Sequence, residues 1–349
     1  MEKKRSIEND AKVNPTLDSE LWIIEGDRTD IDATTNDCDI HNFGNDMKAN
    51  ITGNNVHLQN GGDMPHIITG SNSSGILLKN TGENGRYEVE SSYTTVVEEG
   101  SHSVINTSGN YNNVVVKSIA ENANINNYGS DCKFYIRGNN PRVRNTGDNV
   151  SAKIQGDGFV IEHRASDGEY VLDTYGRMFL YGHNNKVICT NDSQTCDLEA
   201  HGDDNDFCIY GNDVGILTFG DNTKIGIQAE DIILESKGRN IVIHEYGYNN
   251  RMTLSGENIT IYSIGVDSKI DVDAWYSVAY LNCGKIRFGH TGSYLVTTEW
   301  KSLGPHLPDM PIVHTIRVDG IQLKHGIWYN VRNGILLQDD EVSQNNNCD

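Results

Sequence analysis

The 349-residue sequence contains no apolar run long enough to span a membrane. Its first residues, MEKKRSIENDAKV, include basic side chains but lack the apolar segment that follows them in a signal peptide. These two absences predict a chain without a membrane span and without a Sec signal. We therefore expect a cytoplasmic protein, or one exported by a route that needs no such signal.

Basic residues are also scarce. Lysine and arginine total 28 against 49 aspartates and glutamates, which gives a formal net charge of −21. Proteins that bind a phosphate backbone directly neutralise it with lysine and arginine, so this acidic balance excludes direct nucleic-acid binding. Cysteine is limited to seven residues, an odd number. Cys38, Cys132 and Cys196 occupy inward-facing repeat positions, where a reduced thiol acts as a small apolar filler.

A nine-residue repeat runs without interruption from Gly202 to Asp273. Glycine occupies the first position of seven of the eight units, and Ala229 occupies it in the other. Two residues later comes only aspartate or asparagine: Asp204, Asp213, Asn222, Asp231, Asn240, Asn249, Asn258 and Asp267. Five residues after the first position comes an apolar side chain: Phe207, Ile216, Ile225, Leu234, Ile243, Met252, Ile261 and Ile270. Glycine and Asn/Asp tolerate positive φ, so the pattern predicts short strands joined at tight corners.

The same frame extends back to Thr35, with extra residues at three places. When the units are numbered from Thr35, the extra residues follow the fifth, eighth and seventeenth units. These unit numbers differ from one another by multiples of three. Three units per coil would place every bulge at one corner. We therefore predict a triangular coil of 27 residues, with about nine coils in all, stacked at the usual spacing between strands.

This core resembles parallel β-helix proteins, a class that holds polysaccharide lyases and hydrolases, phage tailspikes and fibres, and bacterial adhesins. The resemblance implies an all-β fold, a parallel β-solenoid, and identifies no functional residue. The repeat is also similar to the nonapeptide calcium repeats of secreted toxins. Those repeats carry two glycines and place the apolar residue differently, and half of the corners in the uninterrupted block are neutral asparagine.

We therefore interpret the corners as structural and predict no cofactor, with one alternative. In a 27-residue coil Asp204 and Asp231 would stack as like charges, an arrangement that a Ca²⁺ ion would relieve.

The predicted domain boundaries follow from where the repeat begins and ends. Residues 1–20 are polar and are expected to be a flexible arm, and residues 21–34, with Trp22, an N-terminal cap. The solenoid is predicted to span 35–273. In 274–337 the turn signals Asp319–Gly320 and Asn333–Gly334 predict a small antiparallel β module. The acidic, Asn-rich residues 338–349 are expected to be a disordered tail.

Catalytic candidates depend on the same 27-residue coil. His244 would lie below Asp271, a pair suited to acid/base work, and Lys224 below Arg251. Asp203 and Asp206 resemble the clustered aspartates of β-helix glycosidases. Solvated surface pairs explain all of these positions equally well, and that is the interpretation we favour. Outward aromatic residues form either a sugar-stacking strip or a shield over the corners: Tyr210, Phe219 and Tyr246.

The function predicted from these patterns is non-catalytic. The solenoid would display a C-terminal module that serves in recognition or attachment, as in adhesins and fibres, or that caps the end of the last coil. Trp300, Trp328 and Tyr329 are the predicted partner-binding residues, the partner being a protein or a glycan, and homo-oligomerisation is left open. Two alternatives remain: a polysaccharide-degrading enzyme and an acidic mimic of nucleic acid.

Overall fold

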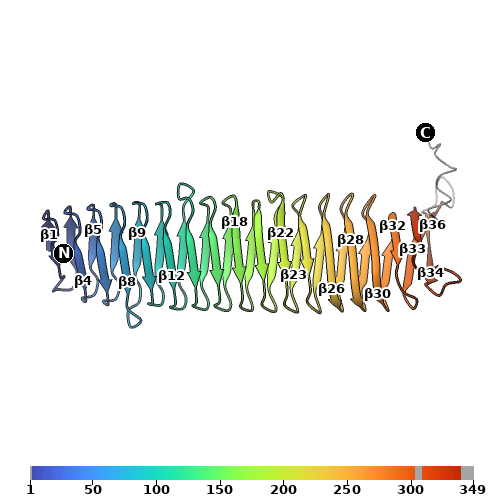
Figure 1. The fold of residues 1–349 in the computed structure, drawn as a ribbon, viewed down its shortest axis with the longest axis horizontal. Coiled ribbons are helices and arrows are strands. Elements are labelled where there is room, and N and C mark those ends of the chain that lie inside the picture. Colours follow the sequence, from blue (N-terminus) through green and yellow to red (C-terminus); the bar gives the residue numbers. More distant parts are fainter. Residues whose placement is uncertain (1, 303–308, 339–349) are drawn as a thin grey trace. The chain divides into compact units, whose positions relative to one another are not determined.

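A computed structural model describes residues 2–302 and 309–338, and every regular element within them is a β-strand. Within the same residues no helix is long and apolar enough to cross a bilayer. The chain divides into two compact units, Met1–Tyr181 and Gly182–Asp349. Each is an all-β parallel solenoid in which strands alternate between two sheets, which confirms the predicted fold class (Figure 1).

In the first unit, blue to green in Figure 1, the odd-numbered strands form one sheet and the even-numbered strands the other. The first sheet contains β1 (Glu2–Ser6), β3 (Glu20–Ile24), β5 (Asp39–Asn42), β7 (His57–Asn60), β9 (Leu77–Asn80), β11 (Thr95–Glu98), β13 (Asn113–Val116), β15 (Lys133–Ile136), β17 (Ser151–Ile154) and β19 (Glu169–Leu172). The second contains β2 (Lys12–Val13), β4 (Asp30–Ala33), β6 (Lys48–Ile51), β8 (His66–Thr69), β10 (Arg86–Val89), β12 (Val104–Thr107), β14 (Asn124–Asn127), β16 (Arg142–Asn145), β18 (Phe159–His163) and β20 (Gly176–Leu180).

The second unit repeats this alternation and ends in antiparallel strands. One sheet contains β21 (Lys186–Cys189), β23 (Asp206–Ile209), β25 (Lys224–Ile227), β27 (Val242–Glu245), β29 (Thr260–Ser263), β31 (Val278–Leu281), β33 (Tyr294–Lys301) and β34 (Met310–Arg317). The other contains β22 (Cys196–Ala200), β24 (Gly215–Thr218), β26 (Ile233–Arg239), β28 (Arg251–Glu257), β30 (Lys269–Trp275), β32 (Gly284–Phe288), β35 (Trp328–Arg332) and β36 (Ile335–Gln338). The antiparallel pairs are β33–β34, β32–β35 and β35–β36.

The coil contains two nine-residue units, so the predicted three-unit, 27-residue coil is wrong. Ile225 pairs with Ile243, and Ile243 with Ile261, which sets a spacing of 18 residues. Ile216 and Ile243, which a triangular coil would place in one column, lie on different sheets. Where the sequence contains extra residues the spacing grows, as between His57 and Leu77. These insertions fall at both corners of a two-sided coil. The spacing of the insertions by multiples of three units is therefore a coincidence.

The predicted inward and outward positions are correct. Ile225, Ile243 and Ile261 are at most 1% exposed, whereas the residue after Ile243, His244, points outward. Side chains alternate across a strand, so each four-residue strand contributes two inward residues to the core between the sheets. Inward-facing polar residues also stack: Asn42 donates to Asn60, Asn60 to Asn80 and Asn80 to Glu98, with N–O distances of 2.6–2.7 Å. These bonds satisfy amide groups that would otherwise be costly to bury, although Asn42 Oδ1 and Glu98 Oε2, at the two ends of the ladder, have no partner among the described residues.

The corners need glycine for close approach, and the Asn/Asp residues for positive φ. Asp204 and Asn222 have φ of 59° and 56°, whereas Gly220 between them in the sequence is outside the positive-φ region. A Cβ added to Gly220 would lie 1.9 Å from the carbonyl oxygen of Gly202 in the preceding coil. Stacked corners therefore leave no room for a side chain there. The sequence analysis had assigned positive φ to both residues of the pair.

The solenoid begins and ends at different residues from those expected. Residues 2–6, expected in the flexible arm, form β1 and pair in parallel with β3. At the other end parallel pairing continues past Asp273 through β31 to β33, and the antiparallel strands are added to these last coils. Residues 339–349, nearly all of the predicted tail, lie outside the described residues.

We expect Gly220→Val to destabilise the second unit by about 1–3 kcal/mol, because the new side chain must push two corners apart. Gly226→Val is the matched control. The nearest atom to a Cβ at Gly226 is the Phe207 carbonyl oxygen at 3.8 Å, and valine suits an outward strand position. Urea unfolding of both variants measures the difference, and equal midpoints would contradict the close-approach argument.

Candidate functional site

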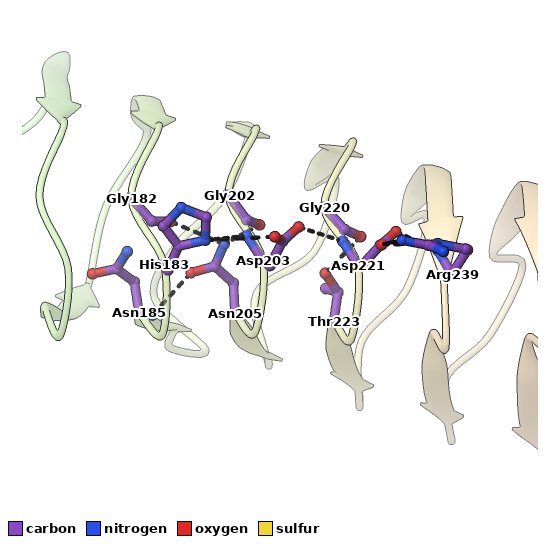
Figure 2. Close-up of polar contacts among 10 residues, drawn as sticks. All are labelled: Gly182, His183, Asn185, Gly202, Asp203, Asn205, Gly220, Asp221, Thr223 and Arg239. Atoms are coloured by element: carbon purple, nitrogen blue, oxygen red, sulfur yellow. Dashed lines mark hydrogen bonds and ion pairs between the residues drawn. The ribbon is translucent and has the colours of Figure 1, made fainter.

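Asp203 belongs to a ladder of polar side chains along one corner of the second unit (Figure 2). Its carboxylate accepts a 2.8 Å hydrogen bond from the backbone N–H of Asp221 in the next coil. Asp221 accepts the corresponding bond from Arg239, and two more from the Arg239 guanidinium at 2.6 and 2.9 Å. Those bonds hold the pKa of the Asp221 carboxyl below its usual range. Asp203 therefore links coils, with His183 of the preceding coil 3.7 Å from its carboxylate.

His244 and Asp271 do not meet. They lie on β27 and β30, in different sheets, because the predicted pairing assumed a 27-residue coil. The His244 ring stacks on Tyr262 with centroids 4.8 Å apart, and Tyr262 stacks on Tyr280 at 4.6 Å. Asp271 instead accepts hydrogen bonds from the guanidinium of Arg287, one of them from Nε at 2.9 Å. The structure thus forms no acid/base pair from these two residues.

Asp204 and Asp231 also lie apart, at different corners. The Asp204 N–H donates to the carbonyl of Asp221, whereas the Asp231 carboxylate accepts a 2.6 Å bond from the amide of Asn249. No group of three or more His, Cys, Asp or Glu side chains in the described ranges could hold a metal ion. The predicted Ca²⁺ site depended on the two aspartates stacking, so its basis is gone.

Asp206 lies in register between Lys186 and Lys224 on outward strand positions. Such a row of alternating charge is typical of a solvated sheet surface, where each pair contributes little. The predicted neighbour of Lys224, Arg251, is on the other sheet, where it pairs in register with Lys269.

Of the three outward aromatic residues predicted to form a strip, Phe219 stacks on a neighbouring ring, whereas Tyr210 and Tyr246 are 42% and 54% exposed. Phe219 stacks on His201 with centroids 4.7 Å apart, and the Lys237 ammonium lies 5.4 Å from the Phe219 ring. A sugar that binds by stacking needs a free ring face. His201 and Lys237 occupy the surroundings of the Phe219 ring, which favours a packing role for that residue.

The three aromatic residues proposed for partner binding differ in exposure. Trp300 is 58% exposed on β33, opposite Pro311. Tyr329 is only 7% exposed, and its hydroxyl accepts a 2.9 Å bond from the backbone N–H of Lys324. Tyr329 is therefore part of the core at this end, and Trp300 and Trp328 remain the candidates.

Trp328 is half-buried and lies against two cations. The Lys269 ammonium is 4.6 Å and the Arg287 guanidinium 5.2 Å from the centre of its ring. Such cation–π contacts are favourable when partly desolvated. These contacts lie on the outward face of the sheet, in which β35 pairs with β32 and Trp328 is in register with Arg287, and there Arg287 also binds Asp271.

The corner before β32 is shorter than those before it. Ser263 is in register with Leu281, and Lys269 with Lys285. Six positions therefore separate Ser263 from Lys269 but only four separate Leu281 from Lys285. Gly284 has a φ of 109°, and its backbone lies close to that of Ser268 in the preceding coil. The loss of two residues leaves a recess where the corner would otherwise continue.

That recess is part of a cavity of about 720 Å³, a volume in the usual range for a small-ligand site. The cavity is lined by residues of the corner before β32, by outward residues near the starts of β28, β30 and β32, and by residues of β35 and of the turn that follows it. The lining residues are Asn249, Arg251, Val266, Asp267, Lys269, Cys283, Gly284, Lys285, Asn330, Val331, Arg332 and Asn333.

Four of these lining residues are cationic and one, Asp267, is acidic, in a chain with a formal net charge of −21. Arg251, Lys269 and Lys285 are consecutive in register on β28, β30 and β32, and Arg332 comes from β35. No ion pair joins Arg251 or Arg332 to a carboxylate among the described residues. The cavity therefore concentrates positive charge.

The nine-residue frame and the 27-residue spacing do not predict this site. Its three strand cations are spaced by 18 and 16 residues, and a search at 27-residue spacing could not align them. The shortened corner was also hidden, because the repeat frame had been followed only to Asp273. A search at 18-residue spacing would have found both signals.

Comparison of the chain with protein-family models, curated proteins and solved structures finds no match.

One buried carboxyl in the first unit has a perturbed pKa without access to a ligand. Desolvation raises the pKa of Glu98 to about 7, although the hydrogen bond from Asn80 opposes this shift. Its Oε1 accepts 2.7 Å bonds from Asn80 and the Gly100 N–H, and the residue is fully buried. A perturbed pKa marks a functional site only where a substrate can reach the group. We interpret Glu98 as the terminal acceptor of the buried asparagine ladder.

Glu98 should make the first unit less stable as the pH rises. Its pKa is raised in the folded state, so between about pH 4.5 and pH 7 the unfolded chain loses this proton first. We expect Glu98→Gln to flatten that decline and to stabilise the protein by up to about 3 kcal/mol at pH 8. Denaturant unfolding across this pH range measures both effects.

Glu245→Gln is the matched control in the second unit. The Glu245 carboxylate is also fully buried but accepts four hydrogen bonds, from Gly247, Asn250, Ser263 and Ser268. Three of these bonds end on Oε1 and the Ser263 bond on Oε2, so glutamine places an N–H donor at one oxygen that now accepts, and this variant should be destabilised. An unchanged pH profile in Glu98→Gln would contradict the assignment.

Proposed function

We propose that this chain is a non-catalytic binding solenoid whose C-terminal coils and antiparallel strands recognise a partner, in the manner of an adhesin or fibre protein. The observation that carries the proposal is the cation-lined cavity at the shortened corner, with Trp328 packed against one of its walls through Lys269. A cavity with a few convergent polar groups is the usual form of a ligand site.

The positions of the candidate catalytic groups favour binding over catalysis. Asp203 accepts bonds that link coils, and Asp271 is neutralised by Arg287. A glycosidase instead needs two carboxyl groups facing each other across a scissile bond. The nucleic-acid mimic receives less support, because outward carboxylates such as Asp206 alternate with lysines.

A polysaccharide panel tests this proposal on the full chain. We expect the protein to retain at least one panel member and to release neither new reducing ends nor unsaturated sugar products. Trp328→Ala should weaken the retained complex by about tenfold or more, as for an aromatic residue at an interface centre.

Phe43→Ala is the matched control, because Phe43 is 57% exposed and lies in the other unit. Both variants should melt close to the parent. Release of sugar products would favour the enzyme alternative, and binding unaffected by Trp328→Ala would contradict recognition at this end.

A further inference from the structure

We infer that the cavity at the shortened corner binds the acidic groups of a polysaccharide, either carboxylates or sulfates. This inference rests on the proposed binding function and adds to it the chemical class of the ligand. Three features of the cavity and a fourth, the charge of the whole chain, support it.

The first feature is a row of like charges that the fold places next to one another. Arg251, Lys269 and Lys285 occupy the same outward position on three consecutive parallel strands, about 4.8 Å apart per strand. Directly opposed like charges destabilise a sheet. A bound anion would offset that repulsion, and Arg332 supplies a fourth cation from the facing hairpin.

The second feature is that Arg251 and Arg332 have no carboxylate partner within residues 2–302 and 309–338. Elsewhere in the chain an arginine often binds a carboxylate in an adjacent coil, as Arg28 binds Asp10 and Arg239 binds Asp221. The register partners of Arg251 are Ile233 and Lys269, neither of which is acidic. Its guanidinium can therefore form a two-pronged bond with a ligand carboxylate or sulfate.

The third feature is a buried amide that opens onto the cavity. Asn330 is 6% exposed and lines the cavity, and its side chain makes no hydrogen bond within the described part of the chain. Its side-chain polar atoms are not among those shut off from solvent without a partner, so the amide can be reached from the cavity. A ligand hydroxyl or acid oxygen would provide a hydrogen-bond partner for it, and Asn333 adds a further amide along the same wall.

The fourth feature is the acidity of the whole chain, which selects among polyanions. Duplex nucleic acid has one charge per about 1.7 Å of axis, so a long stretch of it would be repelled by the surrounding surface. An acidic polysaccharide separates its charges with neutral hydroxyl groups. The lining pairs four cations with three amides, which suits that alternation.

Binding of defined polyanions to the full chain tests the inference. The probes are polygalacturonate, dextran sulfate, neutral dextran and duplex DNA, each measured by calorimetry at low and raised salt. We expect one or both acidic polysaccharides to bind, with affinity falling as salt screens the cations. Neutral dextran and DNA should bind at least about tenfold more weakly.

The double variant Arg251→Ala/Arg332→Ala should weaken acidic-polysaccharide binding by about tenfold or more, because it removes charge-assisted hydrogen bonds. Its control, Arg142→Ala/Lys224→Ala, removes the same charge from exposed positions outside the cavity and should bind like the parent. Equal loss in both double variants would indicate a net-charge effect and overturn the inference.

Cys283 provides a second readout, because it lines the cavity and is partly exposed. Bound polysaccharide should slow alkylation of Cys283 but leave Cys208, which is similarly exposed and outside the cavity, unaffected. Binding without protection of Cys283, or DNA binding as tight as polysaccharide, would refute the inference. Failure of every acidic probe while another panel member still binds through Trp328 would refute this inference alone and leave the proposed function standing.

Discussion

The structure depends on the stacking of each residue on its counterpart in the next coil. Backbone pairing fixes that register, as Ile225 with Ile243 shows, and the side chains must then be compatible with copies of themselves. Apolar residues stack into a core, and buried amides bond to one another, as Asn42 and Asn60 do. Corner carboxylates accept the N–H of the coil that follows, as Asp203 does from Asp221. One constraint therefore explains the core, the buried ladders and the corners.

The same constraint explains why like charges in register are informative. At Asp206 the chain alternates charge, because this residue lies in register between two lysines. The row of Arg251, Lys269 and Lys285 instead places three cations in register, beside the Asn330 amide and a missing piece of corner. At positions that bind a ligand, a protein is expected to contain residues that do not best stabilise the local fold.

The sequence predicted the repeat, the strand positions and the inward residues, because each follows from local chemistry within nine residues. Ile243 is buried and His244 is outward as expected. The number of units per coil could not be obtained from that frame, since closure of a coil is a long-range property. A longer period was nevertheless present. Asn42, Asn60 and Asn80 recur at alternate units, whereas Ile51 occupies the same position in the unit between the first two. Buried asparagine tolerates only another polar group beside it, so that alternation specifies two units per coil.

The shortened corner before β32 bears on how a ligand can recognise one particular position along a repetitive solenoid. Successive coils are related by a nearly constant translation, so any surface built from regular rungs is reproduced at each step, and a ligand would find many equivalent positions. The corner between Leu281 and Lys285, two residues shorter than the one in the preceding coil, interrupts that translational symmetry beside the last coils. A deletion that would be a defect in an isolated turn thus gives these coils a surface that the regular coils before them do not present.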